Sequence, residues 1–411
     1  MKKKLVSVML TAAMTASLLA GCGSSDSTTD TATTTEDAAA ETEETTAEET
    51  TDAAEETETE DAAEETTDAA DSAEITVEGK IAMITDSGDI TDESFNQITW
   101  ETCKAYGEKN GIDCEYYKPA EDTDEERINS IELAIADGAT VLVMPGYLFG
   151  PAIAEEQSLY PDVSFIGIDL VEKDIVNLAG DPVKTADNVY ICSFQEEQAG
   201  YLAGYAAVKD GYTDLGFLGG IAVPAVIRYG FGYVQGINAA AEEMGVDVNV
   251  KYFYGGQFYG DDAITARMEG WYADGTQVVF GCGGGIWTSA LDAAEQYDGK
   301  LIGVDVDQRS AIGERCITSA MKNLSSAVES ALNTYFTGNF ASIGGKIDQL
   351  GLTQGDYIGL PTADESWGFS TFTVDEYEKV LAGIKDGSIE ISNDTENEPE
   401  VGSHVTVDYI Q

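Results

Sequence analysis

Four carboxylates stand close together in the segment ITDSGDITDESFNQ, residues 84–97. They are Asp86, Asp89, Asp92 and Glu93, and they follow a short apolar run that is typical of a buried strand. Asp and Gly residues at the end of a strand often begin a ligand site in α/β proteins. Such carboxylates could hold a metal ion, cleave a bond, or accept hydrogen bonds from an uncharged polar ligand.

The residue types needed for common catalytic and metal sites are scarce. The only histidine is His404, so a Ser-His-Asp or Cys-His arrangement would have to use it, and a histidine-rich zinc site is excluded. The later cysteines are far apart and show no C-x-x-C spacing, so we interpret them as buried small side chains rather than disulfides. They are Cys103, Cys114, Cys192, Cys282 and Cys316. We expect no metal and no cofactor.

Short apolar runs alternate with amphipathic helical patterns from Ile75 onward. Strands are predicted at 80–85, 114–117, 140–144, 163–168 and 188–193, and then at 214–218, 248–253, 277–280, 300–304 and 316–321. Helices are predicted at 94–110, 124–136, 196–209, 226–244, 263–273 and 288–297. Ser94 with Gln97 three residues later is typical of a capping box at the start of the first helix. Strand, helix and strand at this spacing indicate parallel βαβ units.

So many strands fit two sheets better than one. We predict an α/β protein with two lobes, each built on a mostly parallel, doubly wound sheet. Lobe 1 is predicted to comprise 75–193 and 306–343, and lobe 2 to comprise 194–305 and 344–411. Ligands of such sheets bind at the C-terminal ends of the strands, so we expect a cleft between the lobes that closes by hinge motion.

The N-terminal residues 1–21 are typical of an export signal. Lys2-Lys3-Lys4 precede a short apolar stretch that ends in Leu19-Ala20-Gly21-Cys22. A small residue before a cysteine is what lipoprotein processing requires, so we expect Cys22 to become the lipidated N-terminus. The mature chain would then be anchored on the outer face of the cell membrane. A plain secretory signal with a chance cysteine is the alternative.

Residues 22–74 have a different composition. They repeat Thr, Glu, Asp and Ala, and 23–73 contain no aromatic residue, Lys or Arg. We predict a disordered acidic tether rather than a tail that binds a partner, because the segment cannot bury enough apolar surface to fold. The formal net charge is −55 at pH 7, which argues against binding to nucleic acid. A tether of this length favours a Gram-positive envelope.

Isolated aspartates and glycines recur where the predicted strands end. Asp86, Asp169 and Asp305 each follow a strand, and a glycine-rich run at 281–285 follows another. Glycine lets a ligand approach the backbone closely, and we include Gly284 among the candidate ligand contacts. Carboxylate acceptors suit a ligand rich in hydroxyl and NH donors and repel phosphate. Each aspartate taken alone could equally be a cap or turn residue.

These motifs together resemble the basic membrane protein family, the lipoproteins that bind purine nucleosides for ABC importers. The resemblance runs from Lys80 to Asn323. It is carried by T-D-x-G at 85–88, D-x-S-F-N-Q at 92–97, FLGG at 217–220, YGFGYVQG at 229–236, GGG at 283–285, IGVDVDQ at 302–308 and TSAMKN at 318–323. It implies a two-lobed, periplasmic-binding-protein-like (type I) fold and an ABC permease as partner.

The resemblance also implies roles for aromatic and amide side chains. Phe95 would stack on one face of the purine and Tyr229, where relatives tend to carry Phe, on the other. Asn96 would read the edge of the base. Trp287 departs from the family pattern and would narrow the cleft or add a third aromatic wall. Phe95 could instead be a buried anchor of its helix, and Asn96 a solvated first-turn residue.

The remaining implied contacts are charged. Asp305 would accept hydrogen bonds from ribose hydroxyls, and Lys322 would orient that region or neutralise Asp305. Asp86 and Asp169 are candidates to complete the polar cage. In this interpretation Asp89, Asp92 and Glu93 serve the turn and the positive end of the following helix.

Two enzymatic interpretations of the opening segment compete with binding. Nucleoside hydrolases carry Asp-x-Asp-Pro-Gly-x-Asp-Asp after their first strand, but here Ile84, Ser87 and Ile90-Thr91 break the set of calcium ligands. Glycoside hydrolysis needs a paired acid and nucleophile, which nothing in the sequence marks. We therefore predict a non-enzymatic receptor for a purine nucleoside. A sugar or furanosyl-signal receptor of the same fold is the alternative.

Overall fold

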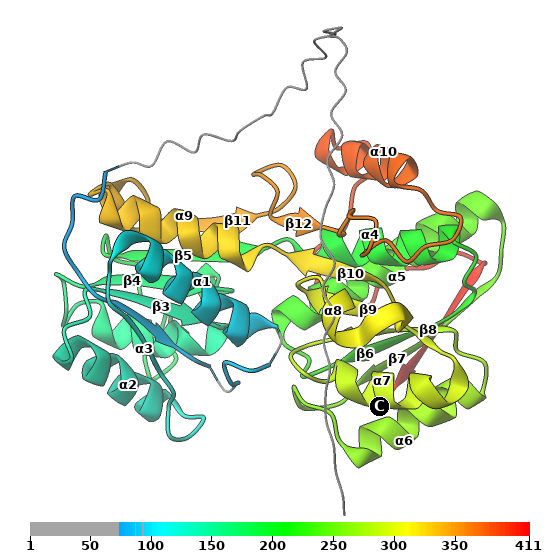
Figure 1. The fold of residues 1–411 in the computed structure, drawn as a ribbon, viewed down its shortest axis with the longest axis horizontal. Coiled ribbons are helices and arrows are strands. Elements are labelled where there is room, and N and C mark those ends of the chain that lie inside the picture. The colour runs from blue at the N-terminus through cyan, green and yellow to red at the C-terminus, as the bar shows by residue number, and fades with distance from the viewer. Residues whose placement is uncertain (1–73, 87, 93) are drawn as a thin grey trace, which may run out of the picture. The chain divides into compact units, whose positions relative to one another are not determined.

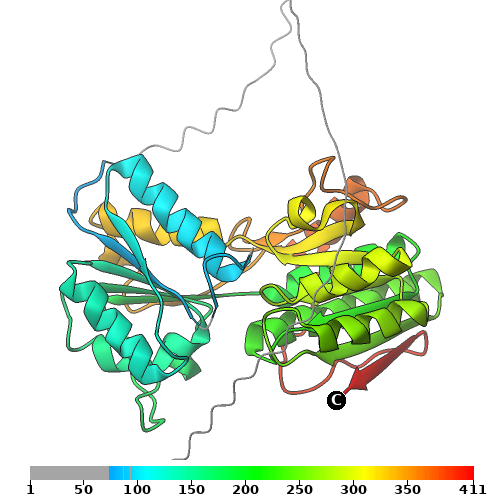
Figure 2. The same ribbon diagram turned by 60° about the horizontal axis from the view of Figure 1, so that its bottom comes forward.

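The computed structural model of the chain describes residues 74–86, 88–92 and 94–411. These residues belong to one compact unit, which contains two β-sheets with helices on both faces of each (Figures 1 and 2). The predicted signal sequence, Cys22 and nearly all of the predicted tether lie outside the described residues. Within the described part of the chain, no helix is both long and apolar enough to cross a membrane.

The first sheet forms the core of lobe 1. Its described strands follow the order β11-β5-β4-β3-β1-β2, and all neighbouring pairs run parallel. The bounds are β1 Ile81–Ile84, β2 Cys114–Tyr117, β3 Val141–Pro145, β4 Ser164–Ile168, β5 Val189–Phe194 and β11 Ile347–Leu350.

Helices cover both faces of this sheet because side chains alternate along each strand. On β1, Ile81 and Met83 pack in the apolar cluster on the side of helices α1 and α9, whereas Ala82 and Ile84 pack in the cluster on the side of α2 and α3. The bounds are α1 Phe95–Asn110, α2 Asp124–Ala136, α3 Gly150–Glu156 and α9 Leu324–Phe336, with short 3-10 turns at Tyr147–Phe149, Glu172–Asp174 and Phe340–Ser342.

The second sheet forms the core of lobe 2. Its order among the described strands is β12-β10-β9-β8-β6-β7-β13, and only the short β12 pairs antiparallel. The bounds are β6 Asp214–Gly219, β7 Val248–Tyr254, β8 Val278–Cys282, β9 Lys300–Asp305, β10 Cys316–Lys322, β12 Ile358–Gly359 and β13 Val405–Ile410. The C-terminal strand β13 pairs with β7 from Val405 to Ile410.

Two helix layers enclose the second sheet. Phe217 and Phe280 face the cluster formed with α4 and α5, while Leu218 and Val279 face the cluster formed with α6 and α7. The bounds are α4 Glu196–Lys209, α5 Pro224–Met244, α6 Asp262–Ala273, α7 Trp287–Tyr297, α8 Arg309–Ile312 and α10 Val374–Lys385, with a 3-10 turn at Gly313–Arg315.

The chain passes between the two sheets three times in the described region. It leaves β5 for α4 at Gln195, leaves β10 for α9 at Asn323, and runs from β11 to β12 across 351–357. All three crossings lie beside one another along one side of the two lobes (Figure 1). The predicted hinge motion of the lobes would take place in these segments.

Two of the predicted lobe boundaries are wrong. Strand β10 was expected in lobe 1, but it pairs parallel with β9 in the second sheet, so lobe 2 continues to Lys322. Strand β11 was expected in lobe 2, but it pairs with β5. The chain leaves β5 for α4 at Gln195, two residues beyond the predicted end of lobe 1 at residue 193.

The predicted capping box at the start of α1 is also wrong, although the helix begins and ends as expected. The Ser94 side chain makes no capping hydrogen bond. Instead the carboxylate of Asp92 accepts from the backbone N–H groups of Ser94, Asn96 and Gln97 at 3.0–3.1 Å. Burial is confirmed for four of the cysteines, Cys103, Cys192, Cys282 and Cys316, whereas Cys114 is half-buried.

Candidate ligand-binding site

The ammonium group of Lys322 lies at the centre of a buried polar cluster. Its Nζ is 2.5 Å from Asp169, 3.4 Å from Glu196 and 3.7 Å from Asp305. Asp169 follows β4 in lobe 1 and Asp305 ends β9 in lobe 2, whereas Lys322 and Glu196 border two of the crossings. One side chain at the hinge therefore contacts carboxylates of both lobes.

Asp305 is held from several directions. Its Oδ1 accepts a hydrogen bond from the Tyr229 hydroxyl at 3.1 Å, and its Oδ2 accepts one from the Ser94 hydroxyl at 2.5 Å. Asp169 and Asp305 both adopt positive φ, 62° and 63°, a region that side-chain-bearing residues seldom occupy. Strain of this kind gathers at ligand sites and persists only where the surroundings enforce it.

Glu196 and Arg228 form an ion pair that the sequence did not indicate. The Glu196 side chain is fully buried, and its Oε2 accepts from Arg228 Nε at 2.6 Å. A glutamate in the first turn of a helix is ordinarily explained by the helix dipole. The contact of Glu196 with Lys322 could therefore not be inferred from the sequence. The one available signal was the arginine of α5 in an otherwise apolar stretch, VIRYGFGYV at 226–234.

The charge states of the cluster follow from burial and from its own ion pairs. Burial alone would lower the pKa of Lys322, but the carboxylates of Asp169, Asp305 and Glu196 raise it overall. Burial alone would raise the pKa of Glu196, but Arg228 and Lys322 lower it overall. Burial raises the pKa of Asp169, and Lys322 offsets part of that rise. Lys322 therefore remains a cation and Glu196 an anion at neutral pH.

Three aromatic rings surround the same ammonium group. Lys322 Nζ lies 4.8 Å from the ring centroid of Phe95, 5.4 Å from that of Phe194 and 5.9 Å from that of Tyr229. These distances permit cation–π attraction. The structure thus brings together five predicted residues, Phe95, Asp169, Tyr229, Asp305 and Lys322, and adds Phe194, which the sequence analysis missed because it ends a buried strand.

Asp86 and Asn96 form a separate pair in lobe 1. The Asn96 amide donates to Asp86 Oδ1 at 2.9 Å and to Asp92 Oδ2 at 3.1 Å, and its Oδ1 accepts from the Asp86 N–H at 3.2 Å. Burial is the main cause that raises the pKa of Asp86. The amide oxygen and the amide nitrogen of Asn96 are thus both used in hydrogen bonds within the loop before α1. These bonds compete with the predicted hydrogen bonds from Asn96 to the edge of a base.

Gly284 lies in the loop after β8, and Trp287 begins α7. Gly284 has φ 51°, and a side chain there would meet the carbonyl of Phe258, so this glycine is required by the packing of its own loop. Trp287 is 7% exposed and packs in the apolar cluster that α6 and α7 share. The predicted role of Trp287 in narrowing the cleft or adding a third aromatic wall stays a prediction.

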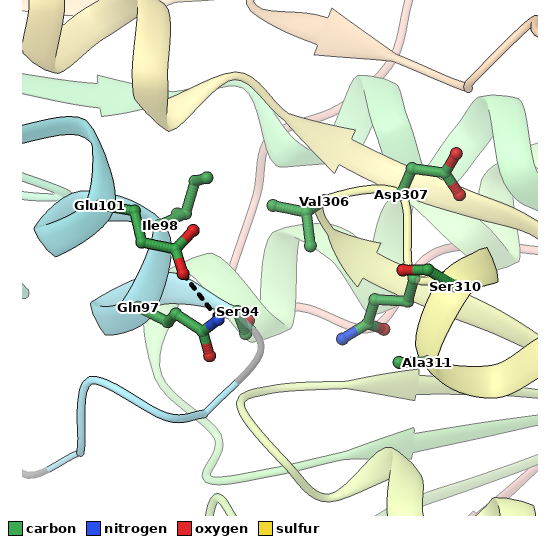
Figure 3. Close-up of a pocket in the computed structure, with 9 residues that line it drawn as sticks. Ser94, Gln97, Ile98, Glu101, Val306, Asp307, Ser310 and Ala311 are labelled. Carbon is green, nitrogen blue, oxygen red and sulfur yellow. Dashed lines mark hydrogen bonds between the residues drawn. The ribbon is translucent and has the colours of Figure 1, made fainter. Parts of the chain in front are cut away.

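Two cavities border the cluster. One of about 350 Å³ lies between the start of α1 and the loop after β9 (Figure 3). The other, of about 700 Å³, contains Asp305 and Lys322 in its wall and extends toward α10. Ile98, Val306 and Asp307 line both, so the cavities adjoin. Both volumes fall in the range of roughly 300–1,000 Å³ that small-molecule sites occupy.

Comparison with known proteins identifies the family. Residues 80–397 match the family described as Bmp, the PnrA-like substrate-binding proteins of ABC transporters. This chain is a member of that family. Bmp proteins are non-enzymatic binding components, so the chain acts with permease subunits on a small solute.

Relatives of this Bmp protein cover most of its length. The ABC transporter nucleoside-binding protein BmpA of Lactococcus lactis is 27% identical over 346 residues, which span 78% of this chain and 91% of the relative. Basic membrane protein B of Borreliella burgdorferi is 28% identical over 293 residues, which span 70% and 82%.

Solved structures support the fold assignment. A solute-binding protein of an Aeropyrum pernix ABC transporter system superposes with a TM-score of 0.61 at 21% identity, covering 77% of this chain and 88% of that one. A solute-binding protein from Conexibacter woesei gives the same TM-score and identity, covering 77% and 99%. The predicted type I periplasmic-binding-protein-like fold is confirmed.

Proposed function

We propose that this Bmp protein is a lipid-anchored receptor that binds a purine nucleoside and delivers it to an ABC permease. The observation that carries the proposal is the Asp305 carboxylate, buried beside Lys322 and in hydrogen-bond contact with Tyr229. A carboxylate fixed in this way is suited to accept hydrogen bonds from the two hydroxyls of a ribose. The Lactococcus lactis relative is a nucleoside-binding protein, which supports the same ligand class.

The charge of the cluster favours a neutral ligand. Asp169, Glu196 and Asp305 supply three carboxylates, and Lys322 and Arg228 supply two cations. Both cations are already paired with carboxylates, so a phosphate would displace those contacts and would meet the Glu196 and Asp305 carboxylates in a buried setting where repulsion is poorly screened. Nucleosides should bind and nucleotides should not.

Aromatic rings beside the same cluster support a flat ligand. Phe95 comes from lobe 1 and Tyr229 from lobe 2, and both rings border Lys322. Stacking of a base on such rings contributes roughly 1–3 kcal/mol. A sugar alone would use the carboxylates but gain less from two rings of different lobes.

The mechanism consists of hinge closure, and no bond is made or broken. The open lobes would admit the ligand, and closure about the three crossings would bring Phe95 and Ser94 of lobe 1 to Tyr229 and Asp305 of lobe 2. Lys322, which contacts both lobes from the hinge, can respond to the ligand and to closure together. Lipidation at Cys22 would keep the receptor at the outer surface of the membrane, near its permease.

Calorimetric titration of the compact unit, Ala70–Gln411, tests the proposal. The panel is guanosine, inosine, adenosine, cytidine, guanine, ribose, galactose and guanosine monophosphate, each with EDTA present. We expect micromolar or tighter binding of at least one purine nucleoside, no binding of free ribose, and no released base by chromatography. Binding of a sugar without any nucleoside would replace the proposal with the sugar-receptor alternative, and released base would indicate a hydrolase.

A further inference from the structure

We propose that the Ser94 hydroxyl is a latch between the lobes, which positions the Asp305 carboxylate and thereby sets the affinity for the ligand. The affinity part of this inference rests on the proposed function. The conformational part does not, because it concerns a contact between two groups of the protein itself.

The contact joins the two lobes through two buried polar side chains. Ser94 directly precedes α1 in lobe 1 and is 1% exposed, while Asp305 ends β9 in lobe 2 and is 6% exposed. The hydroxyl donates to Oδ2 at 2.5 Å. Hydrogen bonds to an ionised group are stronger than neutral ones, and burial strengthens them further.

Among the residues that the structure describes, the other donors to Asp305 come from lobe 2. Tyr229 lies in α5 and Lys322 at the end of β10, and both approach Oδ1. Ser94 is thus the lobe 1 group that fixes the second oxygen. Asp305 has positive φ, so its backbone is strained and its carboxylate depends on surrounding contacts for its orientation.

The hydroxyl of Ser94 is not needed to start its own helix. Asp92 satisfies the backbone N–H groups at the N-terminus of α1, and the Ser94 side chain makes no capping contact. The side-chain oxygen of a serine at a helix start ordinarily accepts a capping hydrogen bond from a backbone N–H group of the first turn. Here Asp92 provides the cap. The Ser94 hydroxyl instead donates to Asp305 of the other lobe.

The energetic consequence follows from the population of closed molecules. A contact that forms only when the lobes meet raises the closed fraction, and the apparent affinity for a ligand that needs closure scales with that fraction. Removing one hydrogen bond to a charged group would weaken ligand binding roughly ten- to hundredfold. It would also open the ligand-free protein.

Small-angle X-ray scattering and calorimetry on three variants test the latch. Ser94→Ala removes the hydroxyl, and Ser94→Thr restores one at the same position. Ser366→Ala is the matched control, because Ser366 is 4% exposed and its hydroxyl also donates to a carboxylate of the same loop, Asp307, but within lobe 2. Far-UV circular dichroism of each variant reports folding.

We expect Ser94→Ala to have a larger ligand-free radius of gyration and weaker guanosine binding, and Ser94→Thr and Ser366→Ala to resemble the parent chain. Unchanged scattering of Ser94→Ala would overturn the latch, as would tighter guanosine binding, which would make Ser94 a competitor of the ligand. If the parent chain binds no nucleoside, the proposed function fails, and the ligand-free scattering alone decides whether the latch stands.

Discussion

Asp305 receives donors from both lobes, and this position makes it the most sensitive single residue of the site. Replacing Asp305 with alanine removes the acceptor proposed for the ribose hydroxyls and leaves Tyr229 and Ser94 without their partner. We expect affinity for a purine nucleoside to fall by about 1–3 kcal/mol, the usual cost of losing a buried hydrogen-bonding group. Calorimetric titration measures the loss, and an unchanged dissociation constant would contradict the ribose assignment.

A variant of Phe95 tests the proposed contact with the base of the nucleoside rather than the contact with the ribose. Phe95→Ala removes a ring that borders Lys322, and stacking of this kind contributes roughly 1–3 kcal/mol. Affinity for guanosine should fall by that amount in the same titration. Tyr116→Ala serves as the control, since Tyr116 is 42% exposed on the far edge strand β2. Equal affinity in both variants would mean that Phe95 only anchors its helix.

At the scale of elements, the start of α1 carries both Ser94 and Phe95, so its cap should influence ligand binding. Asp92→Ala leaves three backbone N–H groups without their acceptor and should lower the free energy of unfolding by about 1 kcal/mol. We also expect weaker nucleoside binding, because the first turn of α1 loses its fixed position. Urea denaturation and titration measure the two effects.

The matched control is the cap of another helix. Asp261 accepts from the N–H of Ile264 at the start of α6, in lobe 2 and among neither cavity's lining residues. Asp261→Ala should lower stability by a similar amount and leave affinity unchanged. If both cap variants bind ligand as the parent does, α1 does not act through its first turn.

Helix α4 contains a buried acid that links stability to pH. Burial, and secondly the Glu196 charge, raise the pKa of Glu197 to about 8. The folded state therefore holds a proton that the unfolded state releases near its ordinary value of 4.5. Stability is then greatest below that ordinary value and declines as pH rises toward 8, by at most about 1.4 kcal/mol per pH unit.

Thermal unfolding at pH 5, 6, 7 and 8 tests this dependence. Glu197→Gln keeps the size of the side chain and removes its titration, so the decline between pH 5 and pH 8 should become shallower and the melting temperature at pH 8 should rise. Glu243→Gln, which alters a largely exposed acid of α5, should leave the slope unchanged. If Glu197→Gln shows the same dependence of melting temperature on pH as the parent, the group that titrates is not Glu197.

Most strands and helices before residue 322 could be predicted closely from local patterns, but the helices α3, α9 and α10 and the strands β11, β12 and β13 were not predicted. The pairing partners of the strands could not be predicted either. The run CITSAMK at 316–322 indicates a strand, and nothing in it specifies pairing with β9 rather than with lobe 1. Sheet membership depends on where the chain turns between lobes, and this depends on contacts distant in sequence. The two wrong boundaries both have this cause.

The candidate site was predictable where strand ends and a family resemblance coincided. This applies to Asp169 and Asp305, whereas Phe95, Tyr229 and Lys322 were predicted from the resemblance alone. The structure gathers all five residues at the Lys322 ammonium group. Glu196 and Arg228 were missed because an acid in a first turn and a lone arginine in a helix have ordinary explanations. Ser94 was assigned as a cap, since the sequence cannot show that Asp92 performs this task.

At the scale of the whole molecule, two lobes around one ligand should be stabilised together. A ligand that binds only the folded state adds about 2.7 kcal/mol to the free energy of unfolding at a concentration of 100 times its dissociation constant. We expect guanosine to raise the melting temperature accordingly, and guanosine monophosphate at the same concentration to produce no shift. A shift with the nucleotide would contradict the argument from the negatively charged cluster.

The pairing of β13 with β7 has a practical consequence for anyone who shortens or tags the protein. The family match ends at residue 397, and a chain cut there would lose Val405–Ile410 and expose the hydrogen-bonding edge of β7. Open edges of this kind recruit strands from other molecules. A tag is therefore better joined beyond Gln411 through a flexible spacer, and insolubility of a chain cut at 397 would reflect an unprotected sheet rather than a damaged binding site.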